Sequence, residues 1–309
     1  MSHGWAGEAI RTAYGRLDRV SEPVSAQPLA VDVIDIDDPD DLRVDDFRDL
    51  NSVDRRPDLP TLPGGRPGKG LVIAEGVLVA QRMIASRFTP HAFLGVDKRL
   101  TELSDDLRNP SLSGVPFYRA SAEVMAEIVG FHLNRGVLGV ARRPAALEVD
   151  DVLATATTIA VLEGVNDHEN IGSIFRNAAG LGVDAVLFGA GCADPLYRRC
   201  VRVSMGHALL VPHARFDDWR GALDLLADHG FTTVALTPRE SAVPLVDAVS
   251  ADKVAVLVGA EGPGLSETAI RGSHVAARIP MSRGTDSLNV ATAAAIAFYE
   301  RVRSGTIDR

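Results

Sequence analysis

Apolar segments alternate with helix-like segments along the second half of the chain. Short apolar runs predict strands at residues 157–163, 184–188, 231–236, 253–258 and 275–279. Apolar residues at helical spacing predict helices near residues 170–180, 217–228, 265–271 and 288–303. The first expected strand is largely apolar, as in a strand that is buried on both faces. Strands that alternate with helices are typical of an α/β fold, in which helices cover both sides of a parallel sheet.

The first half of the chain carries a second, smaller pattern of the same kind. Apolar segments lie at residues 71–79, 92–96, 115–118 and 137–140, with helix-like stretches at residues 75–86 and 122–132. A loop rich in proline and glycine is expected at residues 61–70. We therefore predict a small α/β domain ahead of the larger one.

These patterns divide the chain into an N-terminal extension and two domains. The expected ranges are residues 1–27 for the extension, residues 28–145 for the first domain and residues 150–309 for the second. The extension has apolar residues at helical spacing, so it is either an amphipathic helix or a disordered arm. With 309 residues, 46% of them hydrophobic, the chain is long enough for a core in each domain.

Composition removes several classes of protein. No apolar run approaches the roughly 18 residues of a membrane span, and the N-terminus lacks the apolar core of a signal peptide. We therefore expect a cytoplasmic protein without a membrane partner. Cys192 and Cys200 have no Cys or His neighbours at metal-ligand spacing. They are therefore expected to be buried or idle thiols, and no metal site is predicted.

The charge of the chain limits how it can bind nucleic acid. The formal net charge of −9 argues against a protein that coats nucleic acid nonspecifically. Arginines nevertheless cluster at residues 135, 142 and 143 and again at residues 198, 199 and 202. Each cluster is either part of a local basic groove or ordinary solvated surface charge.

Three short stretches carry the candidate chemistry. They are Asn166-Asp-His-Glu-Asn-Ile-Gly-Ser-Ile-Phe-Arg176, Leu257-Val-Gly-Ala-Glu-Gly-Pro-Gly-Leu265 and Ile279-Pro-Met-Ser-Arg-Gly-Thr-Asp-Ser-Leu-Asn289. Each follows an apolar run, where a strand of an open α/β sheet presents its C-terminal loop to a ligand. We therefore expect them to form one site. The glycine pattern differs from a Rossmann turn, and no Walker sequence is present, which disfavours nicotinamide and nucleotide-triphosphate chemistry.

The three stretches resemble the motifs of the SpoU, or TrmH-like, family of RNA ribose 2′-O-methyltransferases within the SPOUT superfamily. Asn170-Ile-Gly-Ser-Ile-Phe-Arg-Asn-Ala is similar to the first motif, and Gly259-Ala-Glu-Gly-Pro-Gly to the second. Ile279-Pro-Met, followed by Ser287-Leu-Asn-Val, is similar to the third. The resemblance runs from Asp150 onward. More loosely, the first domain resembles the ribosomal-protein-like RNA-binding domain that often precedes the catalytic domain in this family.

The resemblance implies both a fold and an activity. The fold is a parallel sheet with a C-terminal trefoil knot, an exception to the rule against knotted chains. The activity is methyl transfer from S-adenosylmethionine to a ribose 2′-hydroxyl of ribosomal or transfer RNA by a homodimer, and the extra domain favours ribosomal RNA. One alternative is a non-catalytic RNA-binding or ribosome-assembly protein with the same fold. Another is a methyltransferase that acts on protein or on a small molecule.

The resemblance also assigns residues that hold the cofactor. They are Thr237, Gly259, Gly264, Ile279, Met281 and Leu288. The glycines let backbone lie close to a ligand, although an ordinary turn from strand to helix uses glycine as well. Ile279 and Leu288 also fit as core residues at the end of a strand and the start of a helix.

The catalytic set that the resemblance implies contains five residues. They are Asn170, Arg176, Glu261, Ser287 and Asn289. The guanidinium of Arg176 is a poor general base because its pKa lies above about 12. We expect Arg176 to orient the ribose and bind the adjacent phosphate, unless it is a surface arginine paired with Glu169.

The other members of this set have more than one interpretation. Six residues separate Asn170 from Arg176, so the two lie on different faces of a helix unless Asn170 caps or precedes it. Glu261 either orients Arg176 or Asn170, or accepts a proton through water. Ser287 and Asn289 open the last expected helix and fit equally well as N-caps.

Contacts to RNA phosphates are predicted for the two arginine clusters. The residues are Arg135, Arg198, Arg199 and Arg202. The aromatic fraction of 5% disfavours a broad stacking platform. Folded RNA that is recognised by its shape and phosphates fits better.

Overall fold

The computed structural model describes residues 28–52, 58–61, 65–282 and 284–305. The predicted extension of residues 1–27 lies outside them, as does part of the predicted loop at 61–70. The described chain forms two compact units. The N-terminal unit contains residues 28–145 and Leu196–Leu210, and the C-terminal unit contains residues 146–195 and 211–305.

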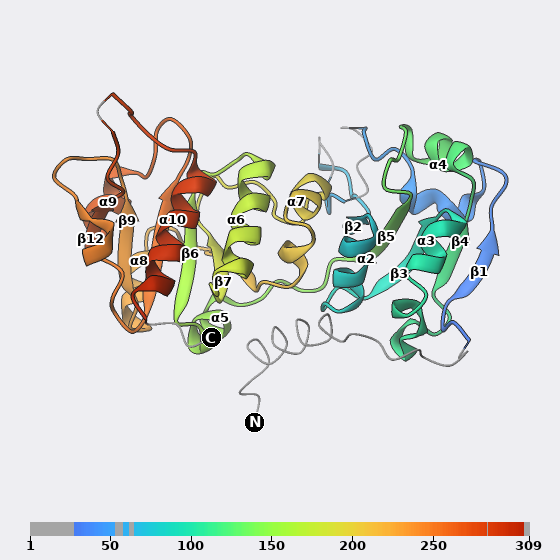
Figure 1. Cartoon of the computed structure of the whole chain (residues 1–309), viewed down its shortest axis with the longest axis horizontal. Coiled ribbons are helices and arrows are strands. Elements are labelled where there is room, and N and C mark those ends of the chain that lie inside the picture. Colours follow the sequence, from blue (N-terminus) through green and yellow to red (C-terminus); the bar gives the residue numbers. More distant parts are fainter. Residues whose placement is uncertain (1–27, 53–57, 62–64, 283, 306–309) are drawn as a thin grey trace. The chain divides into compact units, whose positions relative to one another are not determined.

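A seven-stranded parallel sheet forms the centre of the C-terminal unit (Figure 1). Its strands lie in the order β10-β12-β9-β11-β6-β7-β8. They are β6 (Thr158–Glu163), β7 (Ala185–Phe188), β8 (His213–Arg215), β9 (Thr232–Leu236), β10 (Val243–Pro244), β11 (Val254–Gly259) and β12 (Val275–Arg278). The predicted α/β fold with a parallel sheet is confirmed. β8 and β10 were not predicted, because two or three residues are too few for a periodic pattern.

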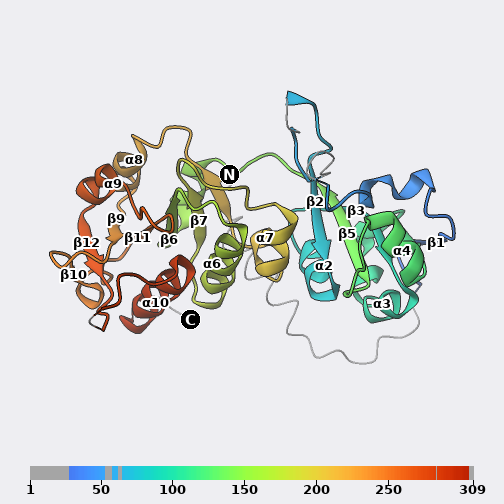
Figure 2. The same ribbon diagram turned by 90° about the horizontal axis from the view of Figure 1, so that it is seen from above.

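Helices cover both faces of this sheet, as the two orthogonal views show (Figures 1 and 2). On one face α5 (Val149–Thr155), α8 (Ala222–Asp228) and α9 (Glu267–Gly272) bury their apolar residues against the strands. On the other, α6 (His168–Gly180) and α10 (Val290–Arg303) lie side by side. The central strands β6 and β11 are therefore buried on both faces, which is why they read as continuous apolar runs.

A fully buried arginine fixes the last helix to the opposite end of the sheet from the three motifs. Arg301 of α10 donates hydrogen bonds to the Thr158 hydroxyl at 3.2 Å and to the Val249 carbonyl at 2.9 Å. It also donates to the Asp252 carbonyl at 2.7 Å. A buried guanidinium is tolerated only when its donors are satisfied in this way. Arg301 thus anchors the helix whose N-terminus carries Asn289.

The N-terminal unit contains a five-stranded mixed sheet in the order β1-β4-β3-β5-β2. Its strands are β1 (Asp32–Asp35), β2 (Leu71–Glu75), β3 (Pro90–Gly95), β4 (Pro116–Arg119) and β5 (Val137–Arg142). β1, β4 and β3 are parallel, whereas β5 runs antiparallel to both β3 and β2. Its helices are α2 (Val77–Ile84), α3 (Asp97–Glu102), α4 (Ala122–Val129) and α7 (Arg198–Val203). Short 3₁₀ turns complete the unit, namely η1 (Leu42–Phe47), η3 (Asp106–Arg108), η4 (Pro110–Leu112) and η5 (His207–Leu209).

One segment departs from the predicted domain boundary. Residues 196–210, with α7 and η5, were expected in the second domain, yet they belong to the N-terminal unit. The reason is hydrophobic burial: Leu196, Val201 and Leu209 pack into one cluster with residues of β2 and α2. The prediction that residues 150–309 form one contiguous domain therefore needs correction at this segment.

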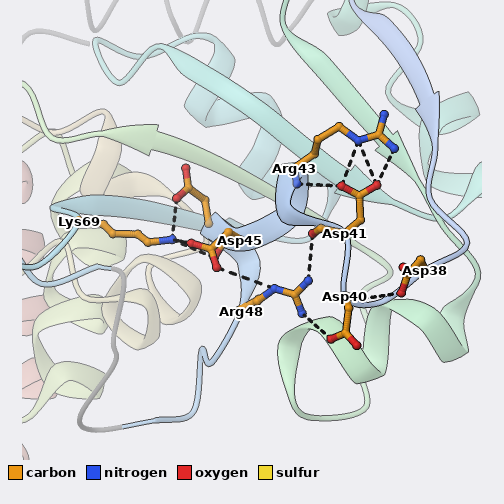
Figure 3. A network of polar contacts seen from close by, with 8 residues as sticks. Asp38, Asp40, Asp41, Arg43, Asp45, Arg48 and Lys69 are labelled. Carbon is orange, nitrogen blue, oxygen red and sulfur yellow. Dashed lines mark hydrogen bonds and ion pairs between the residues drawn. The ribbon is translucent and has the colours of Figure 1, made fainter.

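The acidic run near the start of the N-terminal unit is largely paired with basic side chains (Figure 3). Arg43 donates to both carboxylate oxygens of Asp41, and Lys69 pairs with Asp45 and Asp46. The Arg43 side chain lowers the pKa of Asp41 to about 2. Among the described residues, no helix is long and apolar enough to cross a bilayer.

Candidate cofactor and active site

The three motifs meet at the carboxyl edge of the parallel sheet. Motif 1 follows β6, motif 2 follows β11 and motif 3 follows β12. β6 and β11 are neighbours in the sheet, and β12 is separated from β11 only by β9. Because parallel strands end at the same edge, loops that are more than 100 residues apart in sequence come together here. This confirms the prediction that the three stretches form one site.

A hydrogen-bonded cluster joins one side chain from each motif. The Asn289 amide donates to Oδ1 of Asn170 at 2.8 Å and to Oε1 of Glu261 at 2.7 Å. The Asn170 amide donates to the same Oε1 at 3.0 Å. Asn170 is 9% exposed, whereas Glu261 is open to solvent. The carboxylate is therefore held in place by two neutral amides, neither of which cancels its charge.

Asn289 is an N-cap, one of the two roles that the sequence left open, and its side chain also belongs to the cluster. Its Oδ1 accepts from the backbone N–H groups of Ala291 at 3.0 Å and Thr292 at 3.2 Å, so it is the N-cap of α10. Its Nδ2 donates the hydrogen bonds to Asn170 and Glu261. Ser287 lies before the helix and does not cap it. One side chain thus couples the start of the last helix to the candidate active site.

Asn170 lies inside helix α6 rather than at its cap. The helix begins at His168, and Asp167 is its N-cap, accepting from the backbone N–H groups of Glu169 and Asn170. The alternative in which Asn170 caps or precedes the helix is therefore wrong. Asn170 still reaches the cluster because it lies in the first turn, at the sheet edge where motif 1 begins.

The structure does not bring Arg176 into this cluster. Its side chain is exposed on α6, two turns after Asn170, and forms no hydrogen bond or ion pair with another described residue. The alternative pairing with Glu169 is absent among these residues. A guanidinium without a protein partner is available to an external anion.

A pocket of about 650 Å³ opens beside the cluster. All six residues predicted to hold the cofactor line it, namely Thr237, Gly259, Gly264, Ile279, Met281 and Leu288. Glu261, Ser287 and Asn289 line it as well. The volume lies within the usual range for a small-molecule site, about 300–1,000 Å³. The lining is mostly apolar side chains and backbone, with few charged groups.

The glycines of motif 2 are required by the shape of the loop. A Cβ atom at Gly259 would lie 2.1 Å from the backbone carbon of Gly264, so no larger residue fits there. Gly262 and Gly264 have φ angles of +87° and +70°, which other residues rarely adopt. The Gly264 N–H donates to the Ala260 carbonyl at 2.9 Å, closing the loop upon itself. The loop therefore presents backbone, not side chains, to the pocket.

Sequence reasoning missed part of the pocket wall. Leu236, Pro238 and Arg239 line it from the end of β9, a strand whose following loop shows no glycine-rich pattern. Arg239 pairs with Glu267 at the start of α9. The pairing lowers the pKa of Glu267 through hydrogen bonds from Arg239. The sequence feature that could have indicated this part of the wall is the apolar strand β9, which is followed by Thr237-Pro238-Arg239.

The arginines predicted to contact RNA all belong to the N-terminal unit. Arg198 is mostly buried and pairs with the buried carboxylate of Glu75 at 2.9 Å. Arg202 lies 3.6 Å from the same carboxylate and is 36% exposed. Arg199 and Arg135 are exposed. The ion pair of Arg198 therefore holds α7 against β2.

Both cysteines are free thiols. Cys200 is buried, and burial raises the pKa of the half-buried Cys192. Among the described residues, no group of three or more His, Cys, Asp or Glu side chains is arranged to hold a metal ion.

Comparison with known proteins places this fold and site in a family. The model of the SpoU rRNA Methylase family matches residues 157–299. An uncharacterized tRNA/rRNA methyltransferase of Mycobacterium bovis is 66% identical over 281 residues, 90% of this chain and 94% of that protein. A 23S rRNA (guanosine-2'-O-)-methyltransferase of Vibrio parahaemolyticus is 28% identical over 212 residues, 67% of this chain and 84% of that protein.

A solved structure shows the same fold. The AdoMet-bound rRNA methyltransferase from Sinorhizobium meliloti superposes with a TM-score of 0.70 at 22% identity, over 88% of this chain and 98% of that one. The chain belongs to the SpoU family of tRNA/rRNA methyltransferases. The resemblance that the three motifs indicated is confirmed.

Proposed function

We propose that this protein transfers a methyl group from S-adenosylmethionine to a ribose 2′-hydroxyl of RNA. The observation that carries the proposal is the Asn170–Glu261–Asn289 cluster, which places one oriented carboxylate at the wall of the pocket. The 23S rRNA 2'-O-methyltransferase of Vibrio parahaemolyticus supports the ribose as the target and ribosomal RNA as the substrate class.

The cofactor is S-adenosylmethionine. The Sinorhizobium meliloti enzyme with this fold binds AdoMet, and the pocket residues fit such a molecule. Apolar side chains such as Ile279 and Leu288 suit the faces of an adenine ring, while the exposed backbone of the motif 2 loop offers hydrogen bonds to its edges. When bound, the cofactor supplies a methyl group already activated by its sulfonium. The protein must then align the reactants and help the hydroxyl lose its proton.

Glu261 is the proposed acceptor of that proton, directly or through one water. It supplies the only carboxylate among the described residues that line the pocket. Both of its hydrogen bonds within the cluster are to Oε1, and both donors are neutral. The two amides orient the carboxylate without neutralising its charge, and its other oxygen accepts no hydrogen bond from within the cluster. Asn170 and Asn289 are positioning residues in this proposal.

Arg176 is proposed to bind the RNA phosphate next to the target ribose. Its exposed guanidinium has no protein partner among the described residues, and a phosphate is the anion that a methyltransferase of this family meets on its substrate. A cation at this point also lowers the pKa of the ribose hydroxyl electrostatically. Arg135, Arg199 and Arg202 are proposed to contact phosphates from the N-terminal unit, which recruits the RNA.

The same proposal includes three further properties that the family resemblance implies. They are a trefoil knot at the C-terminal end of the sheet, assembly as a homodimer and a cytoplasmic location. Light scattering of the purified protein at several concentrations measures its mass, and a mass of one chain at every concentration would contradict the homodimer.

Transfer of labelled methyl groups tests the proposed function. Wild type, Arg176→Ala and the matched control Arg220→Ala, another exposed arginine of the same unit, are each incubated with unmodified ribosomal and transfer RNA. We expect label in ribosomal RNA, at a position that resists alkaline cleavage because its 2′-oxygen is methylated. Arg176→Ala should lose about 100-fold in rate, and Arg220→Ala less than about threefold.

The other outcomes separate the alternatives. Label at an alkali-sensitive position would replace ribose methylation by base methylation. No label in any RNA, with the cofactor bound, would favour a non-catalytic ribosome-assembly protein. Equal rates for wild type and Arg176→Ala would remove Arg176 from the mechanism and leave the overall activity intact.

A further inference from the structure

Glu163, which lies outside the pocket, connects the two ends of the motif 2 loop. Glu163 is the last residue of β6 and lies in register with Gly259, the last residue of β11. Its Oε2 accepts a hydrogen bond from the backbone N–H of Ser266 at 2.8 Å. Ser266 is the residue at which the loop ends and α9 begins. Glu163 therefore contacts the loop at both ends, through the backbone register at the start and through its side chain at the end.

The other carboxylate oxygen is held as well. The indole N–H of Trp219 donates to Oε1 of Glu163 at 2.7 Å. Trp219 is itself fixed, because its ring packs against Gly189, where a Cβ atom would lie 2.5 Å from it, and against Phe216 at 6.0 Å between ring centroids. The side chain of Glu163 thus accepts from both donors at once, with Oε1 at Trp219 and Oε2 at Ser266.

The motif 2 loop needs such an anchor. Gly259, Gly262 and Gly264 give it close approach to a ligand, but each glycine adds conformational freedom that must be lost when the loop is ordered. Within the loop, the Gly264 N–H to Ala260 carbonyl bond restrains the turn itself. The far end of the loop is held by Leu265, which is buried in the core. It is also held by the hydrogen bond from the Ser266 N–H to Glu163, which is charge-assisted.

We infer that Glu163 is a positioning residue for the cofactor pocket, holding the motif 2 loop in its binding conformation without touching the ligand. Neither Glu163 nor its partners Trp219 and Ser266 line the pocket. The inference rests on the proposed cofactor and on this family's pocket, and is independent of the RNA substrate. The affinity for the cofactor therefore depends on Glu163, which precedes motif 1 in the sequence.

A pair of substitutions tests this geometry. In Glu163→Gln, one oxygen is replaced by an NH₂ group, so a donor faces either the Ser266 N–H or the Trp219 N–H. Trp219→Phe removes one donor while leaving the carboxylate on Ser266. In the double variant, the carbonyl of the introduced glutamine is free to accept from Ser266 and its NH₂ meets no donor. The double variant should therefore recover part of what Glu163→Gln loses.

The measurements are calorimetric affinity for S-adenosylmethionine and hydrogen exchange of the amides in residues 260–266. We expect Glu163→Gln to weaken cofactor binding about tenfold and to speed exchange of the Ser266 amide by a similar factor. Trp219→Phe should stay within about threefold of wild type, and the double variant should bind at least about threefold better than Glu163→Gln. Glu148→Gln, at an exposed glutamate of the same unit, is the control and should match wild type.

The outcomes are distinct. Glu163→Gln that binds within about twofold of wild type, or a double variant no tighter than Glu163→Gln, would overturn the inference. A lowered melting temperature that fully accounts for the lost affinity, with unchanged amide exchange in the folded protein, would overturn it too. If wild type itself binds no S-adenosylmethionine, the proposed function fails. The exchange experiment still decides whether Glu163 orders the loop.

Discussion

Two glutamates, one in each unit, show how the same side chain is given opposite tasks. Glu261 is open to the pocket and accepts hydrogen bonds from two neutral amides. Glu75 is 5% exposed and pairs with Arg198 and Arg202. Amides orient a carboxylate without neutralising it, whereas arginines cancel its charge. The comparison indicates that the partner of a carboxylate, more than its position in a motif, distinguishes Glu261, which is proposed to react, from Glu75, which is structural.

The largest effect is expected from Asn289→Asp, which separates the two tasks of Asn289. Aspartate is as good an N-cap as asparagine, so the cap of α10 should be kept. The Nδ2 donor is lost, and a second carboxylate is placed beside Glu261. We expect single-turnover methyl transfer to fall about 100-fold, because Glu261 loses one of its two amide donors and faces a second negative charge. Asn289→Ala, which loses the cap too, is the matched variant and should also be less stable by about 1 kcal/mol.

A rate for Asn289→Asp within about threefold of wild type would mean that the amide only caps the helix. The claim that an amide donor orients Glu261 for the reaction would then be wrong.

Glu75→Gln should act on stability instead of on chemistry. It leaves Arg198 mostly buried without its counter-charge, and breaking a buried ion pair costs about 3 kcal/mol. Urea denaturation followed by circular dichroism measures this loss. Affinity for S-adenosylmethionine should change less than about twofold, because Glu75 belongs to the unit that does not hold the pocket. A stable variant that fails to bind the cofactor would contradict this division of roles.

A smaller effect is expected from the exposed arginine beside this pair. Arg199→Ala should weaken RNA binding about threefold to tenfold and reduce its salt dependence, since one phosphate contact is lost. Filter binding at several salt concentrations gives both quantities. Arg198→Met should leave the salt dependence unchanged, because the guanidinium of Arg198 is already committed to Glu75. Equal salt slopes for wild type and Arg199→Ala would exclude Arg199 from the RNA interface.

The smallest effect concerns the exposed pair of Asp41 and Arg43. The pKa of Asp41 is lowered to about 2, so its contribution to stability is present above its ordinary value of 3.8 and disappears as the pH falls towards 2. Asp41→Asn should therefore match wild type in strong acid and be slightly less stable near neutral pH. Thermal midpoints across this range test the sign. A variant that becomes relatively less stable in acid would contradict it.

The outline of the fold was predictable because its signals are local. Residues 158–163 and 254–259 are continuous apolar runs, and their neighbours alternate with helical patterns. The motifs likewise carry their own signal, since the glycines of motif 2 are demanded by the loop's backbone. Placing Gly259, Glu261 and Asn289 at one site required only that parallel strands share an edge.

What could not be predicted depends on distant partners. The burial of Leu196, Val201 and Leu209 against β2 joins α7 to the N-terminal unit, although its sequence lies between two strands of the other unit. Periodicity shows that a face is apolar, but not which surface covers it. Glu163 was missed for the same reason, because its partners Trp219 and Ser266 lie 56 and 103 residues away.

The central claim is that the pocket binds the cofactor while Glu261 serves the transfer. The most direct test compares wild type with Glu261→Gln in two assays on the same preparation, calorimetric titration of S-adenosylmethionine and single-turnover methylation of ribosomal RNA. We predict affinities within about threefold of each other and a loss of at least about 100-fold in the rate of transfer. Equal rates, or a loss of transfer that is fully explained by lost cofactor binding, would contradict the account.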